Sequence, residues 1–180
     1  RWGIPRGDTN FYGFGFKSLN VGKTQISGVE LSFSGRGKIT NNITMNILAG
    51  YTYMQPISLS PDDVYAVLDS AMYWKEEWID SLTYNNSSSD PSVLKYRYKH
   101  LAKIDAELNY KKLSLGGSFR YNDFMKNIDA IFASEFFGIL VPGIIEAREN
   151  GKDGDIIIDT RIGYQLNDMF RFGFIVNNLL

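Results

Sequence analysis

The sequence predicts an all-β fold, an antiparallel segment of a transmembrane β-barrel with about six to seven strands. Three observations predict it. Apolar and polar residues alternate with a period of two over segments of up to about twelve residues, longer than a typical soluble strand. Short connections between these segments alternate with long ones, as they do between the two rims of an outer-membrane barrel. Tyrosine, phenylalanine and glycine are abundant, with 11, 12 and 17 copies among 180 residues.

Composition and charge exclude several classes of function. The formal net charge is −1, so the chain has no overall positive field to attract nucleic acid. It has no cysteine and a single histidine, His100, which excludes disulfide scaffolds, cysteine nucleophiles and histidine metal clusters. No stretch approaches the roughly 18 apolar residues of a membrane helix. We therefore expect no metal site, no cofactor and no nucleic-acid partner.

The first two predicted strands lie on either side of a short polar break at residues 40–42. Residues 29–36 alternate apolar side chains and glycine with charged and hydroxyl side chains. Residues 43–53 continue the pattern, with apolar and aromatic side chains at the odd positions. Residues 11–19 are a candidate for a seventh strand, because three aromatic residues share one face there.

The next two segments predict a hairpin. Residues 100–110 and 113–121 both alternate, and Lys111-Lys112 separates them. A two-residue turn at these lysines would bring apolar side chains of the two strands opposite one another. The expected pairs are Leu108 with Leu115, Ala106 with Gly117, and Ile104 with Phe119.

The last two strands are predicted over residues 156–165 and 170–176. A three-residue turn at residues 166–168 would pair Tyr164 with Phe170 and Ile162 with Phe172.

Two long connections, at about residues 55–97 and 123–154, fall at the same end of the predicted sheet, where loops of this length are usually functional. In the first, the sequence Ser60-Pro61-Asp62-Asp63 predicts a helix start, and apolar residues at helical spacing extend it to about Ile79. Trp74 and Trp78 would share one face of this helix and stack on a ligand or a partner, or pack the helix onto the barrel rim. Residues 85–91 have the composition of a turn or a disordered linker.

The charged side chains of the strands alternate with the apolar ones, so they share a face. An eight-stranded barrel leaves no room for so many charges, and a larger water-filled or plugged lumen fits better. The candidate lumen-facing residues are Glu30, Lys103, Asp105, Glu107, Arg120, Asp159, Arg161 and Arg171. Aromatic residues near the ends of the apolar faces predict the two girdles of a barrel. These are Tyr51, Tyr53, Tyr110, Tyr121, Tyr164 and Phe170.

Four stretches, in order, resemble the carboxy-terminal barrel of TonB-dependent outer-membrane receptors, particularly those of Bacteroidetes-like bacteria. They are NVGKTQISGVEL (20–31), AGYTY (49–53), LKYRYKH (94–100) and IVNNLL (175–180). The resemblance implies a barrel of about 22 strands, plugged by an amino-terminal domain, in the bacterial outer membrane. It also implies that the family's plug and last strand lie outside this sequence. We therefore expect residues 1–180 to be the carboxy-terminal portion of the barrel of a longer receptor, with the long loops extracellular and the short turns periplasmic.

The resemblance further implies active uptake of a scarce nutrient, such as a metal chelate, a corrinoid, a glycan or a peptide. The implied partners are outer-membrane lipid, the remaining barrel and plug, the TonB complex acting through the plug, a surface lipoprotein lid and a small extracellular ligand. A passive porin and a soluble β-sandwich binding module remain alternatives. We expect no enzyme, because Asp105 and Glu107 lie two residues apart as in any polar lumen and no nucleophile motif accompanies them.

Overall fold

The computed structural model describes residues 22–180, so the candidate strand over residues 11–19 lies outside the described part. The elements follow one another in this order: β1 (Thr24–Thr40), β2 (Ile43–Ser58), β3 (Ala66–Trp74), β4 (Glu77–Leu82), α1 (Tyr84–Ser87), β5 (His100–Tyr110), β6 (Leu113–Asn122), the 3-10 helix η1 (Ala130–Ala133), α2 (Glu135–Leu140), α3 (Ile144–Asn150), β7 (Asp155–Gln165) and β8 (Arg171–Val176). None of the helices in this part of the chain is long and apolar enough to cross a membrane.

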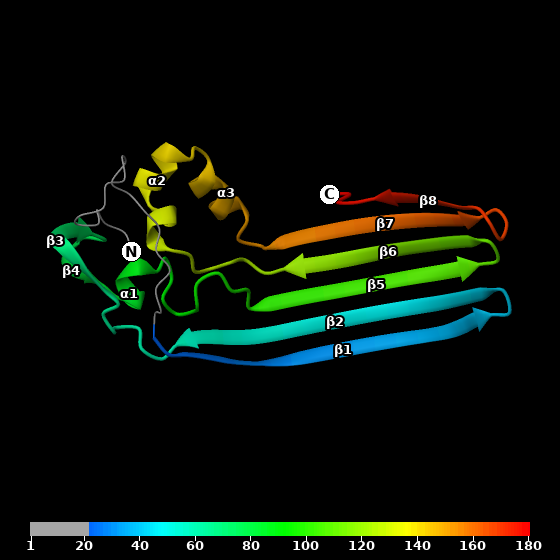
Figure 1. The fold of residues 1–180 in the computed structure, drawn as a ribbon, viewed down its shortest axis with the longest axis horizontal. Coiled ribbons are helices and arrows are strands. Elements are labelled where there is room, and N and C mark those ends of the chain that lie inside the picture. The colour runs from blue at the N-terminus through cyan, green and yellow to red at the C-terminus, as the bar shows by residue number, and fades with distance from the viewer. Residues whose placement is uncertain (1–21) are drawn as a thin grey trace. The chain divides into compact units, whose positions relative to one another are not determined.

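Six strands form one sheet in the order β1-β2-β5-β6-β7-β8, and β3 pairs with β4 in a separate two-stranded sheet (Figure 1). In the large sheet, β2 pairs with β5, β5 with β6, β6 with β7 and β7 with β8, and these four pairings are antiparallel. All six strands predicted from the alternation are present, and β5 has its predicted bounds. The predicted all-β antiparallel class is therefore confirmed.

The connections of the large sheet alternate as predicted. Residues 41–42 and 111–112 are two-residue turns, and residues 166–170 form the third short connection. Residues 59–99 and 123–154 connect the strands at the opposite end of the sheet. The first long connection begins a few residues later than predicted, because β2 continues to Ser58.

The predicted hairpin of β5 and β6 has the expected register, with Leu108 opposite Leu115 and Ile104 opposite Phe119. The predicted register of β7 and β8 was wrong by two residues, since Tyr164 lies opposite Phe172. The reason is the side chain of Asn167, whose Oδ1 accepts hydrogen bonds from the backbone N–H groups of Met169 and Phe170 at 3.0 and 2.9 Å. This local turn keeps Phe170 out of the strand.

The helix predicted from residue 60 to about residue 79 was wrong, because these residues contain the hairpin of β3 and β4. The turn residues Lys75 and Glu76 have φ values of 49° and 69°, the left-handed conformation at both central positions that matches the twist of a tight hairpin. Ser60 does not cap a helix; its Oγ accepts a hydrogen bond from the N–H of Lys23 at 3.0 Å.

The described residues form two compact units. The loop unit comprises residues 56–97 and 126–145 together with residues 22–26, and the wall unit comprises residues 27–55, 98–125 and 146–180. The buried apolar side chains of the described part all belong to the loop unit: Pro56, Leu82, Tyr84, Val93, Leu94, Ile128 and Ala130. In the wall unit the apolar side chains of the strands are largely exposed, so this sheet has no covered core of its own.

Candidate functional site

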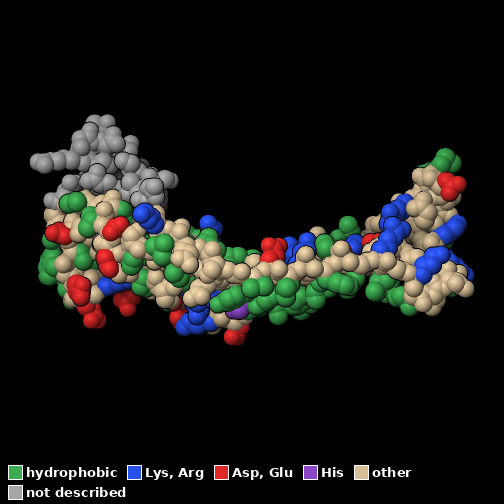
Figure 2. All heavy atoms as spheres, turned by 90° about the horizontal axis from the view of Figure 1, so that it is seen from below, with side chains coloured by type: hydrophobic (Ala, Val, Ile, Leu, Met, Phe, Trp, Pro, Cys, Tyr) green, Lys and Arg blue, Asp and Glu red, His purple; other side chains and the backbone are tan. Residues whose placement is uncertain are grey.

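One face of the wall unit carries mainly apolar and aromatic side chains. The strand register aligns Leu108, Leu115, Ile162 and Phe174 in one row across four strands, and neighbouring rows repeat the pattern. Figure 2 views this sheet from its edge, with hydrophobic side chains gathered on one face and charged ones over the other. A contiguous exposed apolar surface of this kind is typical of contact with lipid or with another protein.

The candidate girdle residues lie at both ends of this apolar face. At the long-loop end, Tyr51 and Tyr121 are both paired with Ala102, which lies between them in the sheet. Tyr53 lies opposite His100. At the short-turn end, Tyr110 and Tyr164 are both paired with Leu113. Phe170 lies in the turn at residues 166–170 rather than in the strand.

His100 joins the aromatic residues at the long-loop end. Its Nδ1 is 2.8 Å from the hydroxyl of Tyr51, and its ring centroid is 5.1 Å from that of Tyr53. Such rings, apolar in the body and polar at the tip, suit the boundary between hydrocarbon and water.

The opposite face of the wall unit brings six of the predicted charged residues together. Arg161 on β7 reaches β5, where its Nη1 and Nη2 each lie 2.8 Å from a carboxylate oxygen of Asp105 and its Nε lies 3.3 Å from Glu107. Arg120 and Asp159 form a second ion pair at 2.9 Å, and Lys103 lies opposite Arg120. The two-pronged geometry of the Arg161–Asp105 pair is the strong form of an ion pair.

The remaining two candidates form no ion pair in this cluster. Arg171 at the start of β8 lies 3.4 Å from the hydroxyl of Ser114 and lines one cavity together with Glu107 and Arg161. Glu30 is exposed on β1. A Cβ on Gly35 would lie 3.4 Å from the side chain of Ile47, which is on the apolar face. Glu30 is five residues before Gly35 on β1, and because successive side chains of a strand alternate between faces, Glu30 belongs to the polar face.

The two carboxylates that sequence analysis considered for acid–base chemistry, Asp105 and Glu107, are both bound to Arg161. Within residues 22–180, no group of three or more His, Asp or Glu side chains could hold a metal ion.

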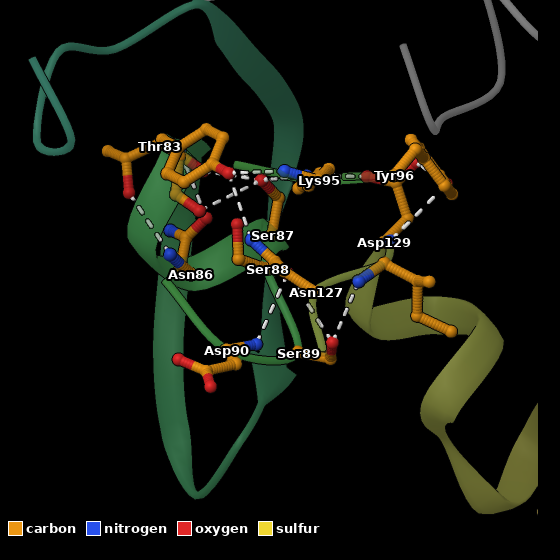
Figure 3. A network of polar contacts seen from close by, with 12 residues as sticks. Thr83, Asn86, Ser87, Ser88, Ser89, Asp90, Lys95, Tyr96, Asn127 and Asp129 are labelled. Carbon is orange, nitrogen blue, oxygen red and sulfur yellow. Dashed lines mark hydrogen bonds and ion pairs between the residues drawn. The ribbon is translucent and has the colours of Figure 1, made fainter. Parts of the chain in front are cut away.

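The loop unit is organised around Asn127, which is fully buried (0% exposed). Its Nδ2 donates to the carbonyl of Val93 at 2.6 Å and to the hydroxyl of Tyr84 at 2.9 Å, while its Oδ1 accepts from the N–H of Asp90 at 3.2 Å (Figure 3). The hydroxyl of Ser89 also donates to Oδ1, at 3.4 Å. Asn127 belongs to the second long loop and these four partners belong to the first. One side chain therefore joins the two long loops.

A second connection between the long loops centres on Asp129. Its two carboxylate oxygens accept hydrogen bonds from Lys95 at 2.5 Å and from the hydroxyl of Tyr96 at 2.7 Å (Figure 3). Burial and the hydrogen bond to Asp129 raise the pKa of Tyr96 to about 12, so its phenol stays protonated and donates. Ser88 and Asp129 also form a β-bridge.

Residues 85–91, predicted as a turn or linker, belong to this ordered core. Thr83 and Asn86 form a capping box at the start of α1, and Ser88 is fully buried. Composition misled here because short polar residues suit a linker and also suit backbone hydrogen bonds in a compact core. Sequence reasoning missed Asn127 and Asp129 as well, since neither belongs to an alternating or helical pattern.

The shared helical face predicted for Trp74 and Trp78 was wrong, because the two residues lie on different strands of the hairpin. Trp78 lies opposite Tyr73 and Trp74 lies opposite Glu77. Trp78 is 73% exposed, with its ring 5.7 Å from that of Tyr73. Trp74 instead donates from Nε1 to the carbonyl of Asn86 at 2.9 Å and lines an apolar pocket.

Long antiparallel strands with one apolar and one charged face, joined by short turns at one end and long loops at the other, define the wall of an outer-membrane β-barrel. Residues 4–179 match the family model described as TonB dependent receptor-like, beta-barrel. The chain belongs to this family, which confirms the resemblance inferred from the sequence. Comparison with curated proteins and with solved structures found no match.

Family membership fixes the general role of the protein. The members are receptors and transporters of the bacterial outer membrane, and they are not enzymes. Their barrel holds a plug and works together with TonB.

Proposed function

We propose that the chain forms part of the wall and the extracellular cap of a receptor that actively imports a scarce nutrient across the outer membrane. Candidate nutrients are a metal chelate, a corrinoid, a glycan and a peptide. The observation that carries the proposal is the division of the wall unit into an apolar face and a face of paired charges. A wall between lipid and an aqueous or plugged lumen needs both faces along its whole length, and the apolar face of the wall unit is exposed rather than covered by a second sheet within the described residues.

In this proposal the charged face lines the lumen, where water or a plug can solvate its ion pairs. The lumen-facing residues are Glu30, Lys103, Asp105, Glu107, Arg120, Asp159, Arg161 and Arg171. The apolar face contacts lipid. The tyrosines near its two ends form the girdles at the two membrane surfaces.

The two long loops, at about residues 55–97 and 123–154, are extracellular and form the cap over the ligand. Asn127 and Asp129 support this role, because they hold the loops in one hydrogen-bonded unit that can present a defined surface. Trp78 is exposed on this unit and is available to a ligand or to a lipoprotein lid.

The remaining partners follow from the same architecture. Residues 1–180 are the carboxy-terminal portion of a barrel of about 22 strands. Among the described strands, β1 and β8 each have a single neighbour, and we propose that other strands of the barrel pair with their open edges. TonB acts through the plug of the same receptor.

The proposal is tested by comparing cells with and without the receptor gene in a complex nutrient medium, with and without an uncoupler of the proton-motive force. Mass spectrometry follows the loss of each compound from the medium. We expect one class of compound to disappear only when the receptor is present and the membrane is energised. Receptor-dependent loss that persists with the uncoupler would instead identify a passive pore.

A further inference from the structure

The wall unit has a cavity of about 270 Å³ near the short turns of the large sheet. Its lining includes Ser114 on β6 and Gly163 on β7, which lie opposite each other. The guanidinium of Arg171 lies over Gly163, because a Cβ on this glycine would be 2.4 Å from Oγ of Ser114 and 3.3 Å from Nη2 of Arg171. Arg161 and Glu107 also line the cavity. The cavity is therefore open on the polar face, at the end of the sheet away from the long loops.

The lining of this cavity has more positive than negative charge. It contains two guanidinium groups, those of Arg161 and Arg171, and one carboxylate, that of Glu107. Arg161 is already paired with Glu107 and Asp105. Arg171 forms no ion pair with a carboxylate of the described residues, and its hydrogen bond to the hydroxyl of Ser114 is long, at 3.4 Å. One guanidinium in the cavity therefore has no anionic partner within the described part of the chain.

A guanidinium without an anionic partner selects carboxylates and phosphates. Its planar set of N–H donors can bind two oxygens of one carboxylate, the geometry that Arg161 and Asp105 show on the same face. Water solvates the charge of Arg171 while the cavity is open. A protein surface that covers the cavity removes this water, and a buried charge is costly unless an anion accompanies it. Any protein segment that fills the cavity must therefore bring an acidic group.

The position of the cavity favours one occupant. In the proposed function a nutrient approaches from the long loops, whereas the cavity lies at the opposite end of the strands. The barrels of this family hold a plug. We propose that an aspartate or glutamate side chain of the plug enters this cavity and forms an ion pair with Arg171. The inference rests on the proposed function, because it requires the polar face to line the lumen.

Photo-crosslinking of the full receptor in cells tests this contact. Arg171 is replaced by p-benzoylphenylalanine, and in a matched control the same replacement is made at Phe174, on the apolar face of the same strand. Mass spectrometry of the digested receptor then identifies the peptides joined to each position. We expect position 171 to be joined to a plug peptide that contains Asp or Glu, and position 174 to no plug peptide. Absence of a plug peptide at position 171, or equal recovery from both positions, would overturn the proposal.

Charge reversal tests the ion pair itself. Arg171→Glu places a negative charge against the plug carboxylate. Lys38→Glu makes the same charge change outside the cavity, on the polar face of β1, since Lys38 lies eight residues after Glu30. The measurement is the fraction of open channels in planar bilayers, at a urea concentration that begins to displace the plug.

We expect Arg171→Glu to raise this open fraction at least about tenfold, the order of effect when one charge-assisted hydrogen bond is lost. Lys38→Glu should leave it within about twofold of the wild type. Equal open fractions in the two variants would overturn the proposal.

A second exchange tests whether the contact is direct. The plug carboxylate identified by crosslinking is changed to arginine in the Arg171→Glu receptor, which should return the open fraction to within about twofold of the wild type. A double variant as open as Arg171→Glu alone would contradict a direct ion pair. Energy-independent uptake with a crosslinked plug would overturn active import and leave the ion pair standing. Energised uptake without a plug crosslink would overturn the ion pair and leave active import standing.

Discussion

The guanidinium of Arg161 crosses the sheet directly over Gly116. A Cβ on Gly116 would lie 2.5 Å from Nε of Arg161. Gly116 is opposite Glu107 on one side and opposite Arg161 on the other, so the absence of a side chain on the middle strand opens the path from β7 to β5. The ion pairs of Arg161 with Asp105 and Glu107 depend on this glycine.

Replacing Gly116 with alanine should therefore displace Arg161 from its two carboxylates. We expect the free energy of unfolding of the full receptor in detergent to fall by about 1–2 kcal/mol, because the ion pairs are only partly shielded from water. Gly173→Ala is the control, since a Cβ at that position would meet no atom within 4 Å. Equal effects of the two substitutions in denaturant titrations would contradict this role of Gly116.

Asn127→Asp should loosen both long loops at once. The new carboxylate oxygen would face the carbonyl of Val93 in place of an N–H donor, and burial of the charge would add to the cost, about 2–4 kcal/mol in local stability. Hydrogen exchange should accelerate together in residues 84–96 and 126–131. Asn150→Asp at the exposed end of α3 should change neither segment. Acceleration in only one loop would show that Asn127 does not couple them.

Tyr96 should resist ionisation until high pH. Its pKa in the folded protein, about 12, lies above the ordinary value of 10.0, so the folded loop unit holds the phenolic proton more tightly than the unfolded chain does. The contribution of the protonated Tyr96 phenol to the free energy of unfolding is fully present below about pH 10 and is lost as the pH rises towards 12. The phenolate absorbance of the wild type minus that of Tyr96→Phe measures this group alone. A midpoint near pH 10 would contradict the hydrogen bond to Asp129.

The two tryptophans of the β3–β4 hairpin should respond differently to replacement by phenylalanine. Trp74→Phe removes the hydrogen bond to Asn86 and part of the wall of the pocket, which should lower the local stability by about 1–2 kcal/mol. Trp78→Phe alters an exposed side chain and should change it by less than about 0.5 kcal/mol. Hydrogen exchange of residues 66–82 compares the two variants. A larger loss of local stability in Trp78→Phe than in Trp74→Phe would contradict the finding that Trp74 is the anchored tryptophan of the hairpin.

The wall unit was predictable from the sequence because its strands have a strict period of two. Each side chain lies on either the apolar or the polar face of the sheet. The alternation therefore locates each strand in the sequence and assigns each of its side chains to a face, as the pairing of Leu108 with Leu115 illustrates. The register of β8 was not predictable in this way, because it depends on one side chain, Asn167, whose hydrogen bonds lengthen the turn. A shift of two residues leaves the alternation unchanged, so the pattern could not reveal it.

The loop unit was less predictable because its order comes from contacts between distant residues. Asn127 finds its partners between 34 and 43 residues away in the sequence, and no local spacing signals such pairs. The hairpin of β3 and β4 was mistaken for a helix because its apolar residues fit both periods over a short stretch. The left-handed conformation of Lys75 and Glu76 decides in favour of the hairpin, and neither residue is a typical signal for it.

The most direct test of the central claim, that the two faces of the wall meet lipid and lumen, places one charge on each face at the same depth. Ile104 lies opposite Ala49 on the apolar face, and Leu48 lies opposite Asp105 on the polar face. In the structure the two side chains are similarly exposed, at 45% and 50%. The measurement is the amount of folded, heat-modifiable receptor in the outer membrane of cells. Ile104→Arg should sharply reduce it, since arginine in the middle of the lipid face costs about 2–4 kcal/mol, and Leu48→Arg should leave it near the wild-type level. Normal assembly of Ile104→Arg together with loss of Leu48→Arg would contradict the account.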